Sequence, residues 1–121
     1  FQPARRKRVV SPTARSLKYL RAQGYTAAVV EHFNPHARVR VDLFGAFDIL
    51  AVASHPFANP GIVGVQVTSG SHVAARVTKL RALPIVTGWK TAGARAVVHG
   101  WRKVLGPRGT RKTWQVREVW L

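Results

Sequence analysis

The order in which helical and extended apolar patterns follow one another most constrains how this chain can fold. The segment 12–23 starts at Ser11 and Pro12, a helix N-cap and a proline suited to the first turn, and Gly24 ends it. The segment 69–81 has the same helical spacing of apolar residues. The expected core stripes are Ala14, Leu17 and Leu20 in the first helix and Val73, Val77 and Leu80 in the second.

Extended patterns fill most of the remaining chain. β-branched and alternating residues predict strands or extended segments over 25–33, 37–44, 46–53, 62–68, 95–101 and 112–120. Turn-forming residues separate them at 34–35, 55–61 and 106–109. The segment 84–93 is ambiguous and is compatible with a short helix that carries Trp89. Helix, strands, helix and further strands, without an internal repeat, indicate a mixed α/β fold.

Chain length and charge add a second constraint. A chain of 121 residues suits one domain, which we expect over residues 11–121. Lys and Arg number 20 against four acids, a formal charge of +16, while 46% of residues are hydrophobic. A chain with this hydrophobic content is expected to fold despite its excess positive charge. Phosphate is the natural counterion of that charge, which favours nucleic acid as the partner. Residues 1–10 hold Arg5, Arg6, Lys7 and Arg8 and are expected to form a flexible basic arm.

Several protein classes are excluded by what the sequence lacks. It contains no cysteine, which removes disulfide scaffolds, thiolate zinc sites and cysteine nucleophiles and suits an intracellular compartment. No apolar run approaches the roughly 20 residues that cross a bilayer. No amphipathic helix combines Trp or Phe with a basic face, as a membrane-surface helix would. Nucleic acid is therefore favoured over a membrane as the polyanion bound.

The few acidic residues are the main clue to chemistry. The chain has only Glu31, Asp42, Asp48 and Glu118, and the first three fall within one short stretch. Asp42 is flanked by Arg38 and Arg40, which favours a solvated ion pair. Asp48 lies instead among apolar residues of an expected strand, where an unpaired carboxylate costs several kcal/mol. A bound cation would offset that cost.

Oxygen donors on neighbouring strands could complete such a cation site. Mg²⁺ or Mn²⁺ prefers oxygen ligands, and adjacent strands lie about 4.8 Å apart, so Asp48 and the side-chain carbonyl of Gln66 could share an ion. Glu31, on the preceding strand, is a third candidate. The chemistry expected is metal-assisted phosphodiester hydrolysis. Gln66 has an alternative interpretation, in which it satisfies a buried backbone group.

Two sequence runs carry a resemblance to a known family. The run DLFGAFDILA over residues 42–51, and GVQVTS over 64–69 before a basic helix, resemble the PD-(D/E)XK nuclease superfamily. Within it the pattern over 12–81 is similar to archaeal-type Holliday junction resolvases and small phage-encoded nucleases. The resemblance implies a restriction-endonuclease-like mixed central β-sheet flanked by helices. It also implies Asp48 as the first metal-binding acid, a homodimer, and a prokaryotic or phage-infected cell as the setting.

The sequence departs from the family pattern at two positions. Gln66 stands where the second acid is expected, and Thr68 stands where a lysine is expected. Glutamine ligates through oxygen but carries no charge, and threonine cannot replace an ammonium. The missing cation could come from Lys79 or Arg76 on the following helix, and Thr68 or Ser69 could orient water. Two alternatives thus stay open, an active endonuclease that cuts DNA and an inactive fold that only binds it.

The residues expected to touch nucleic acid follow from the charge pattern. Those predicted to contact phosphates are Arg5, Arg6, Lys7, Arg8, Arg15, Lys18, Arg76 and Lys79. A rival interpretation from another class is a non-enzymatic binder, such as a ribosomal-type RNA-binding protein, and it rests on charge alone. The four tryptophans, Trp89, Trp101, Trp114 and Trp120, could stack on bases, but their apolar surroundings favour core packing.

Overall fold

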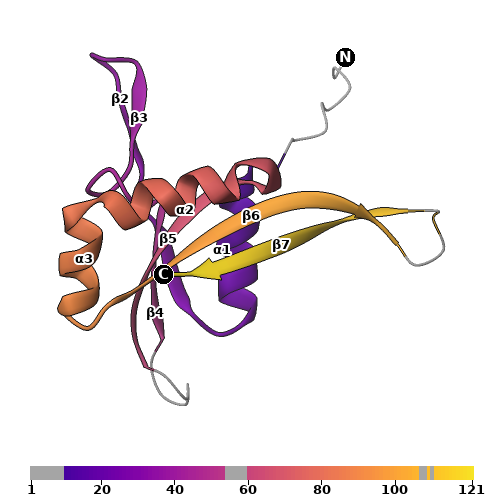
Figure 1. The fold of residues 1–121 in the computed structure, drawn as a ribbon. Helices are drawn as coiled ribbons and strands as arrows, with labels where there is room; N and C mark the ends of the chain where they lie inside the picture. The colour runs from indigo at the N-terminus through magenta and orange to yellow at the C-terminus, as the bar shows by residue number, and fades with distance from the viewer. Residues whose placement is uncertain (1–9, 54–59, 107–108, 110) are drawn as a thin grey trace.

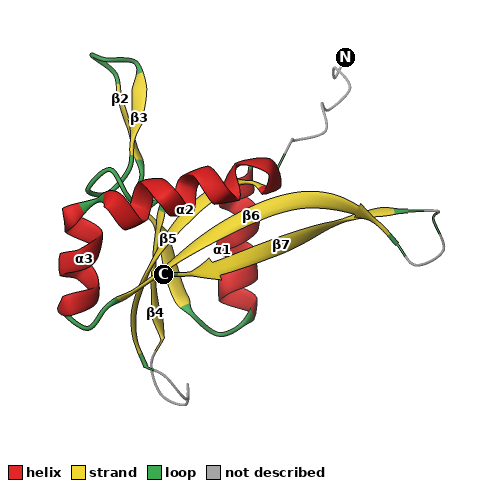
Figure 2. Cartoon of the chain, in the orientation of Figure 1, coloured by secondary structure: helices red, strands yellow, loops and turns green. Residues whose placement is uncertain are grey.

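A five-stranded mixed sheet lies between two layers of helix (Figures 1 and 2). The computed structural model describes residues 10–53, 60–106, 109 and 111–121. The strands, in sheet order, are β1 (Thr26–Val29), β4 (Ile49–Ala53), β5 (Gly61–Ser69), β6 (Arg95–Leu105) and β7 (Lys112–Trp120). Only β5 and β6 are parallel, and the other neighbours are antiparallel. The expected α/β fold class, a mixed sheet flanked by helices, is confirmed.

The connection between the two parallel strands is helical, as a crossover between parallel strands normally is. It runs through the short helix η1 (Gly70–His72), α2 (Val73–Ala82) and α3 (Pro84–Thr91). The expected helix over 69–81 therefore begins with a 3₁₀ turn, and the ambiguous segment 84–93 is a helix. Trp89 on α3 donates from Nε1 to the carbonyl of Arg95 at 2.7 Å, which ties the crossover to β6.

Helix α1 (Pro12–Ala22) covers the opposite face of the sheet. It is capped as expected, because the Ser11 hydroxyl accepts from the amide of Ala14 at 3.1 Å. Leu20 is buried and Leu17 packs beside it. The expected stripe is wrong at Ala14, which is exposed, while Ser16 is fully buried. A polar residue can take this inward position because its hydroxyl has partners on β6, as described below.

Side chains of β5 alternate between the two cores. Val63, Val65 and Val67 pack under α1, so Gln66 and Thr68 point to the other face. The second core there contains Phe47 and the stripe of α2, Val73, Val77 and Leu80, as expected. Gly64 is required at its position, because a Cβ atom there would lie 2.6 Å from the Phe47 ring.

The expected strand over 25–33 is interrupted. It ends at β1, and residues 32 to 34 form β2 (His32–Asn34), which pairs with β3 (Val39–Val41) in a separate hairpin that projects from the body (Figure 1). The break has a physical cause: the amides of Val30 and Glu31 both bond the carbonyl of Asp48, at 2.9 and 3.3 Å, where the chain leaves the sheet. Glu31 therefore lies between strands, not within one.

The other extended segments are also shorter than expected. The segment 37–44 is a strand only over β3, and Phe44, with φ of 57°, lies in a tight turn. The strand expected from Ala46 starts at Ile49, so Asp48 stands just before β4. The Asp48 amide still donates to the carbonyl of Val65 at 2.8 Å, which keeps it beside β5.

The tryptophans divide between core and surface. Trp101 is buried and Trp89 packs against the second core, as expected. Trp114 and Trp120 do not fit the expected core packing, because 40% and 43% of their surfaces are exposed. Both lie on β7, which is an edge strand of the sheet among the described residues.

Some expectations concern residues outside the described part. These are Arg5, Arg6, Lys7 and Arg8, most of the loop 55–61, and part of the turn 106–109. In the described part, no helix has the length and apolar character needed to cross a membrane.

Candidate metal centre

Three of the four carboxylates converge at the base of the projecting hairpin. Glu31, Asp42 and Asp48 each place one oxygen within 4.8 Å of the other two. Glu31 immediately precedes β2 and Asp42 immediately follows β3, so the hairpin brings them opposite each other. Asp48 joins them because the carbonyl of this residue anchors the chain at Glu31. Of the predicted ligands, the structure therefore brings Glu31 and Asp48 together and adds Asp42.

Asp42 is the residue that the sequence reasoning missed. It was expected to be a solvated partner of Arg38 or Arg40, and that interpretation is wrong, because Arg40 pairs with Glu31 at 3.2 Å instead. A signal was present in the turn-forming Asn34 and Pro35. A hairpin centred just after them sets residues 31 and 42 side by side, as the pairing of His32 with Val41 shows.

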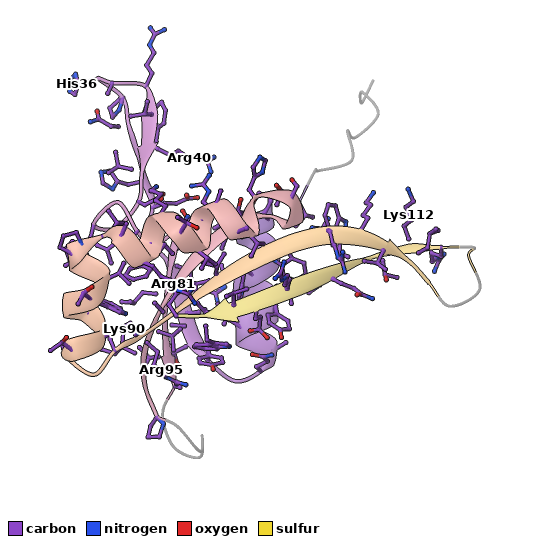
Figure 3. All side chains as sticks on the ribbon, viewed as in Figure 1. His36, Arg40, Arg81, Lys90, Arg95 and Lys112 are labelled. Carbon is purple, nitrogen blue, oxygen red and sulfur yellow. The ribbon has the colours of Figure 1, made fainter. Side chains whose placement is uncertain are left out.

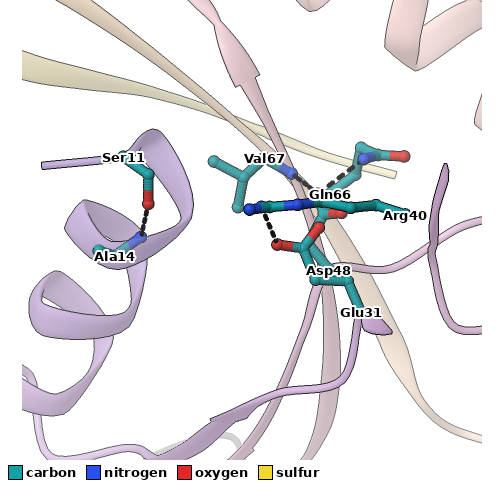
Figure 4. Close-up of polar contacts among 7 residues, drawn as sticks. All are labelled: Ser11, Ala14, Glu31, Arg40, Asp48, Gln66 and Val67. Atoms are coloured by element: carbon teal, nitrogen blue, oxygen red, sulfur yellow. Dashed lines mark hydrogen bonds and ion pairs between the residues drawn. The ribbon is translucent and has the colours of Figure 1, made fainter. Parts of the chain in front are cut away.

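Asp48 is bonded tightly on one side (Figure 4). Its Oδ2 accepts from Gln66 Nε2 and from the backbone amide of Val67, both at 2.7 Å. Only 4% of Asp48 is exposed. The predicted proximity of Asp48 and Gln66 is thus present, because Asp48, immediately before β4, bonds a side chain of β5.

The electrostatics around Asp48 are unfavourable for a bare carboxylate. Burial is the largest cause that raises its pKa, to about 8, and the nearby Asp42 and Glu31 carboxyl groups add to the rise, against the Val67 amide. Three carboxylates close together cannot all be ionised cheaply without a counter-charge. A divalent cation would supply that charge and bring the pKa of Asp48 back down.

The Gln66 amide lies beside the acids with its nitrogen toward them and its oxygen turned away (Figure 4). Its Oε1 is buried and has no hydrogen-bond partner, while Nε2 of the same amide bonds Asp48. A buried acceptor without a partner costs about 1–3 kcal/mol, so a half-turn of the amide that brings this oxygen to a bound ion would relieve that cost. Opposite oxygens around octahedral Mg²⁺ lie about 4.1 Å apart, close to the spread of the three carboxylates. The donor set fits a hard divalent cation.

Positive charge at the centre comes from the hairpin and not from the helix. Arg40 is the residue whose guanidinium pairs with the cluster, and its side chain is 70% exposed. Lys79 is exposed on α2 and Arg76 is half-buried, and neither has a hydrogen bond or ion pair to the acids within the described residues. Thr68 is buried on the same face as Gln66.

The fourth carboxylate belongs to a different polar group, which sequence reasoning did not find. Ser16 on α1 bonds His99 Nδ1 at 2.9 Å, and His99 Nε2 lies 3.3 Å from Glu118 Oε1. The order serine, histidine, glutamate resembles that of a hydrolytic triad. Ser16 and His99 are both fully buried, however, and Trp101 Nε1 donates to the serine hydroxyl at 2.7 Å. This group joins α1 to the sheet and has no access to substrate.

Comparisons with protein-family models, with curated proteins and with solved structures found no significant match to the chain. The function is therefore inferred from the geometry and charge of its own residues.

Proposed function

We propose that this protein is a metal-dependent DNA endonuclease of the PD-(D/E)XK type, with its centre at the base of the β2–β3 hairpin. One observation carries the proposal. Three carboxylates converge beside the buried amide of Gln66, whose oxygen has no partner, in a chain that is otherwise strongly cationic. Neither a surface ion pair nor core packing accounts for that combination, whereas a cation held next to a bound phosphate does.

The architecture supports the same proposal. Asp48 stands immediately before β4, and Gln66 lies on the antiparallel neighbour of that strand, β5. A mixed sheet with helices on both faces is what the resemblance to restriction-endonuclease-like nucleases implies. The short hairpin that holds Glu31 and Asp42 is an insertion between β1 and β4, and it supplies two acids where the second family acid is replaced by Gln66.

Each residue of the centre has a distinct part in the proposed chemistry. Glu31, Asp42 and Asp48 would hold Mg²⁺ or Mn²⁺, and Gln66 would add a neutral fourth donor once its amide turns Oε1 toward the ion. When bound, such an ion supplies an activated water and charge neutralisation at the attacked phosphate. Asp48 must lose its proton to bind the ion, so ion binding should strengthen as pH rises toward 8.

Arg40 would act on the phosphate and replace the missing lysine. It lies on β3, pairs with Glu31 and keeps most of its side chain in solvent, so the guanidinium can turn from Glu31 to a phosphate oxygen. Thr68 cannot supply that charge, and Lys79 and Arg76 make no contact with the acids in the described part of the chain. Those two remain predicted phosphate contacts, together with Arg15 and Lys18 on α1.

Cleavage of labelled DNA tests the proposal. The full chain is incubated with a four-way junction, a flap and a plain duplex in Mg²⁺, in Mn²⁺ and in EDTA. We expect divalent-dependent strand cleavage that Asp48→Asn abolishes while DNA binding persists. Glu118→Gln is the matched control, since it neutralises the carboxylate that lies outside the cluster.

Two results would change the proposal. If the wild-type chain binds all three substrates and never cuts them, the inactive DNA-binding alternative stands in place of the nuclease. Equal loss of cleavage in Asp48→Asn and Glu118→Gln would remove the hairpin base as the active centre. The substrate preference would also test the expected homodimer, because paired symmetric cuts in a junction require two centres.

A further inference from the structure

A concave surface lies on the face of the sheet that α1 covers, away from the face to which Gln66 points. It is a cleft of about 400 Å³ between α1 and the β6–β7 hairpin. Arg15, Lys18 and Tyr19 line it from the helix, and Trp101 and Trp114 line it from the strands. Its volume lies within the range of about 300–1,000 Å³ that small-molecule sites occupy.

Trp114 is placed where the hairpin extends beyond the rest of the sheet. Residues 95–101 of β6 pair with β5, but the later residues of β6 pair only with β7. Trp114 stands opposite Lys103 in this extension, with 40% of its surface exposed. The aromatic ring is therefore presented to solvent on a ribbon, not buried under helix α1.

The groups around Trp114 are cationic. The Arg15 guanidinium lies 4.1 Å from the centroid of a Trp114 ring, and the Lys103 ammonium lies 5.3 Å from it. Lys18 lines the same cleft, and none of the described residues that line it is acidic. Lys112 projects outward from the same hairpin (Figure 3). An exposed aromatic ring with several cations suits a ligand that has both a flat π surface and negative charge.

Unpaired nucleotides have that chemistry. A base can stack on tryptophan or on an arginine plane, and the adjoining phosphates can bond Arg and Lys. Paired bases inside a duplex cannot present their faces in this way. We propose that this cleft binds an unpaired stretch of a DNA strand, with one base against the Trp114 and Arg15 pair and its phosphates on Lys18 and Lys103. The choice of DNA over RNA rests on the proposed function.

The chain offers a matched control in Trp120. It lies on the same strand, is 43% exposed and stands 5.3 Å from the Arg95 guanidinium, so its local surroundings are similar. It does not line the cleft. Loss of Trp120 therefore reports the general effect of removing an exposed tryptophan from β7.

Binding in EDTA tests the proposal without dependence on cleavage. Fluorescence anisotropy would measure the affinity of the full chain for labelled oligo-dT, oligo-rU and a blunt duplex. We expect Trp114→Ala to weaken oligo-dT binding about tenfold, by loss of one stacked base, while Trp114→Phe retains most of it. Trp120→Ala should match wild type, and the blunt duplex should bind both alanine variants alike.

Arg15→Gln adds an independent readout. It should weaken oligo-dT binding. It should also reduce the slope of log binding constant against log salt concentration by the amount that corresponds to about one phosphate contact. Equal effects of Trp114→Ala and Trp120→Ala on oligo-dT binding would overturn the proposal. An effect of Trp114→Ala confined to oligo-rU, or equal for the duplex and for oligo-dT, would overturn it as well. Failure of the nuclease proposal would show separately, as absent cleavage in Mg²⁺ with oligo-dT binding intact.

Discussion

The protein contains two groups of inward-facing polar side chains, and each keeps one buried atom without a hydrogen bond. In the first group, the Ser16 hydroxyl accepts from the Trp101 indole and bonds the His99 imidazole, and the unbonded His99 Nε2 lies 3.3 Å from Glu118 Oε1. At the hairpin base, Asp48 instead faces two other acids. The two groups therefore differ in charge balance, because the first sets one carboxylate beside an imidazole, whereas three carboxylates beside one exposed arginine point to a missing cation.

The two groups also differ in how pH should affect them. Burial raises the pKa of Asp48 and lowers the pKa of His99, although the nearby Glu118 opposes the second shift. Folding therefore favours the protonated acid at one site and the neutral imidazole at the other. As pH changes, the two sites should therefore alter the free energy of unfolding in opposite directions.

The largest expected effect is on cleavage. Asp48→Asn removes a charged ligand, so we expect divalent-dependent cleavage to fall by at least about a hundredfold, since even outer-shell changes cost about 10–100-fold. Glu118→Gln should stay within about twofold of wild type, because it lies outside the acidic cluster. Initial rates on a labelled junction in Mg²⁺ would measure both. Similar cleavage rates for Asp48→Asn and wild type would show that the acidic cluster is no more important for cleavage than the group of Glu118.

A few kcal/mol of pH-dependent stability should come from Asp48. Its folded pKa is raised, so the folded chain holds more protons than the unfolded chain between about pH 4 and pH 8, and stability is lost as pH rises through that range. Urea unfolding in EDTA would show this loss. Asp48→Asn should flatten it, and excess Mg²⁺ should restore stability near pH 8. If stability is still lost with rising pH in Asp48→Asn, other titratable groups cause that loss.

His99 should give the opposite slope. Its folded pKa is lowered, so the unfolded chain binds more protons below about pH 6.5, and stability falls as pH drops through that value. His99→Phe should remove this acid-side loss, at the expense of the bond from Ser16. Unfolding curves from pH 5 to pH 7 in the Asp48→Asn background would isolate the effect. An unchanged acid-side slope would show that His99 is not its source.

Ser16→Ala should destabilise the protein by about 2–3 kcal/mol, since it leaves Trp101 Nε1 and His99 Nδ1 buried without their partner. Cleavage per folded molecule should not change. Ser71→Ala is the control, because this serine is exposed, and it should shift stability by no more than about 0.5 kcal/mol. Equal stability of the two variants would mean that the hydrogen bonds of Ser16 contribute little.

The smallest stability effect is expected at Arg40. Its pair with Glu31 is mostly exposed, so Arg40→Gln should cost less than about 0.5 kcal/mol. Cleavage should nevertheless fall about tenfold, if this guanidinium stabilises charge on the phosphate. Lys90→Gln on α3 is a matched loss of one exposed cation that is not among the predicted phosphate contacts. Equal reductions in both variants would indicate a general charge effect and not a role of Arg40.

Local patterns allowed a large part of the fold to be predicted. Helix α1, strand β5 and helix α2 follow from the Ser11 cap, the alternation of valines and the stripe from Val73 to Leu80, which are properties of neighbouring residues. The hairpin was missed, because β-branched residues run on through Val30 and only the bonds to the Asp48 carbonyl interrupt the strand. Trp114 and Trp120 were misjudged because a strand pattern does not tell an edge from a centre.

By itself, the sequence determined the charge, the fold class and the unusual position of Asp48, since composition and short-range periodicity need no knowledge of distant contacts. Tertiary structure alone decided which polar groups meet. It placed Asp42 with Glu31 and Asp48, and it joined Ser16 to His99, which lies 83 residues further along the chain. Such pairings depend on strand register and on contacts between distant segments. Turn residues such as Asn34 indicate a hairpin, but local preferences do not specify which distant residues lie beside it.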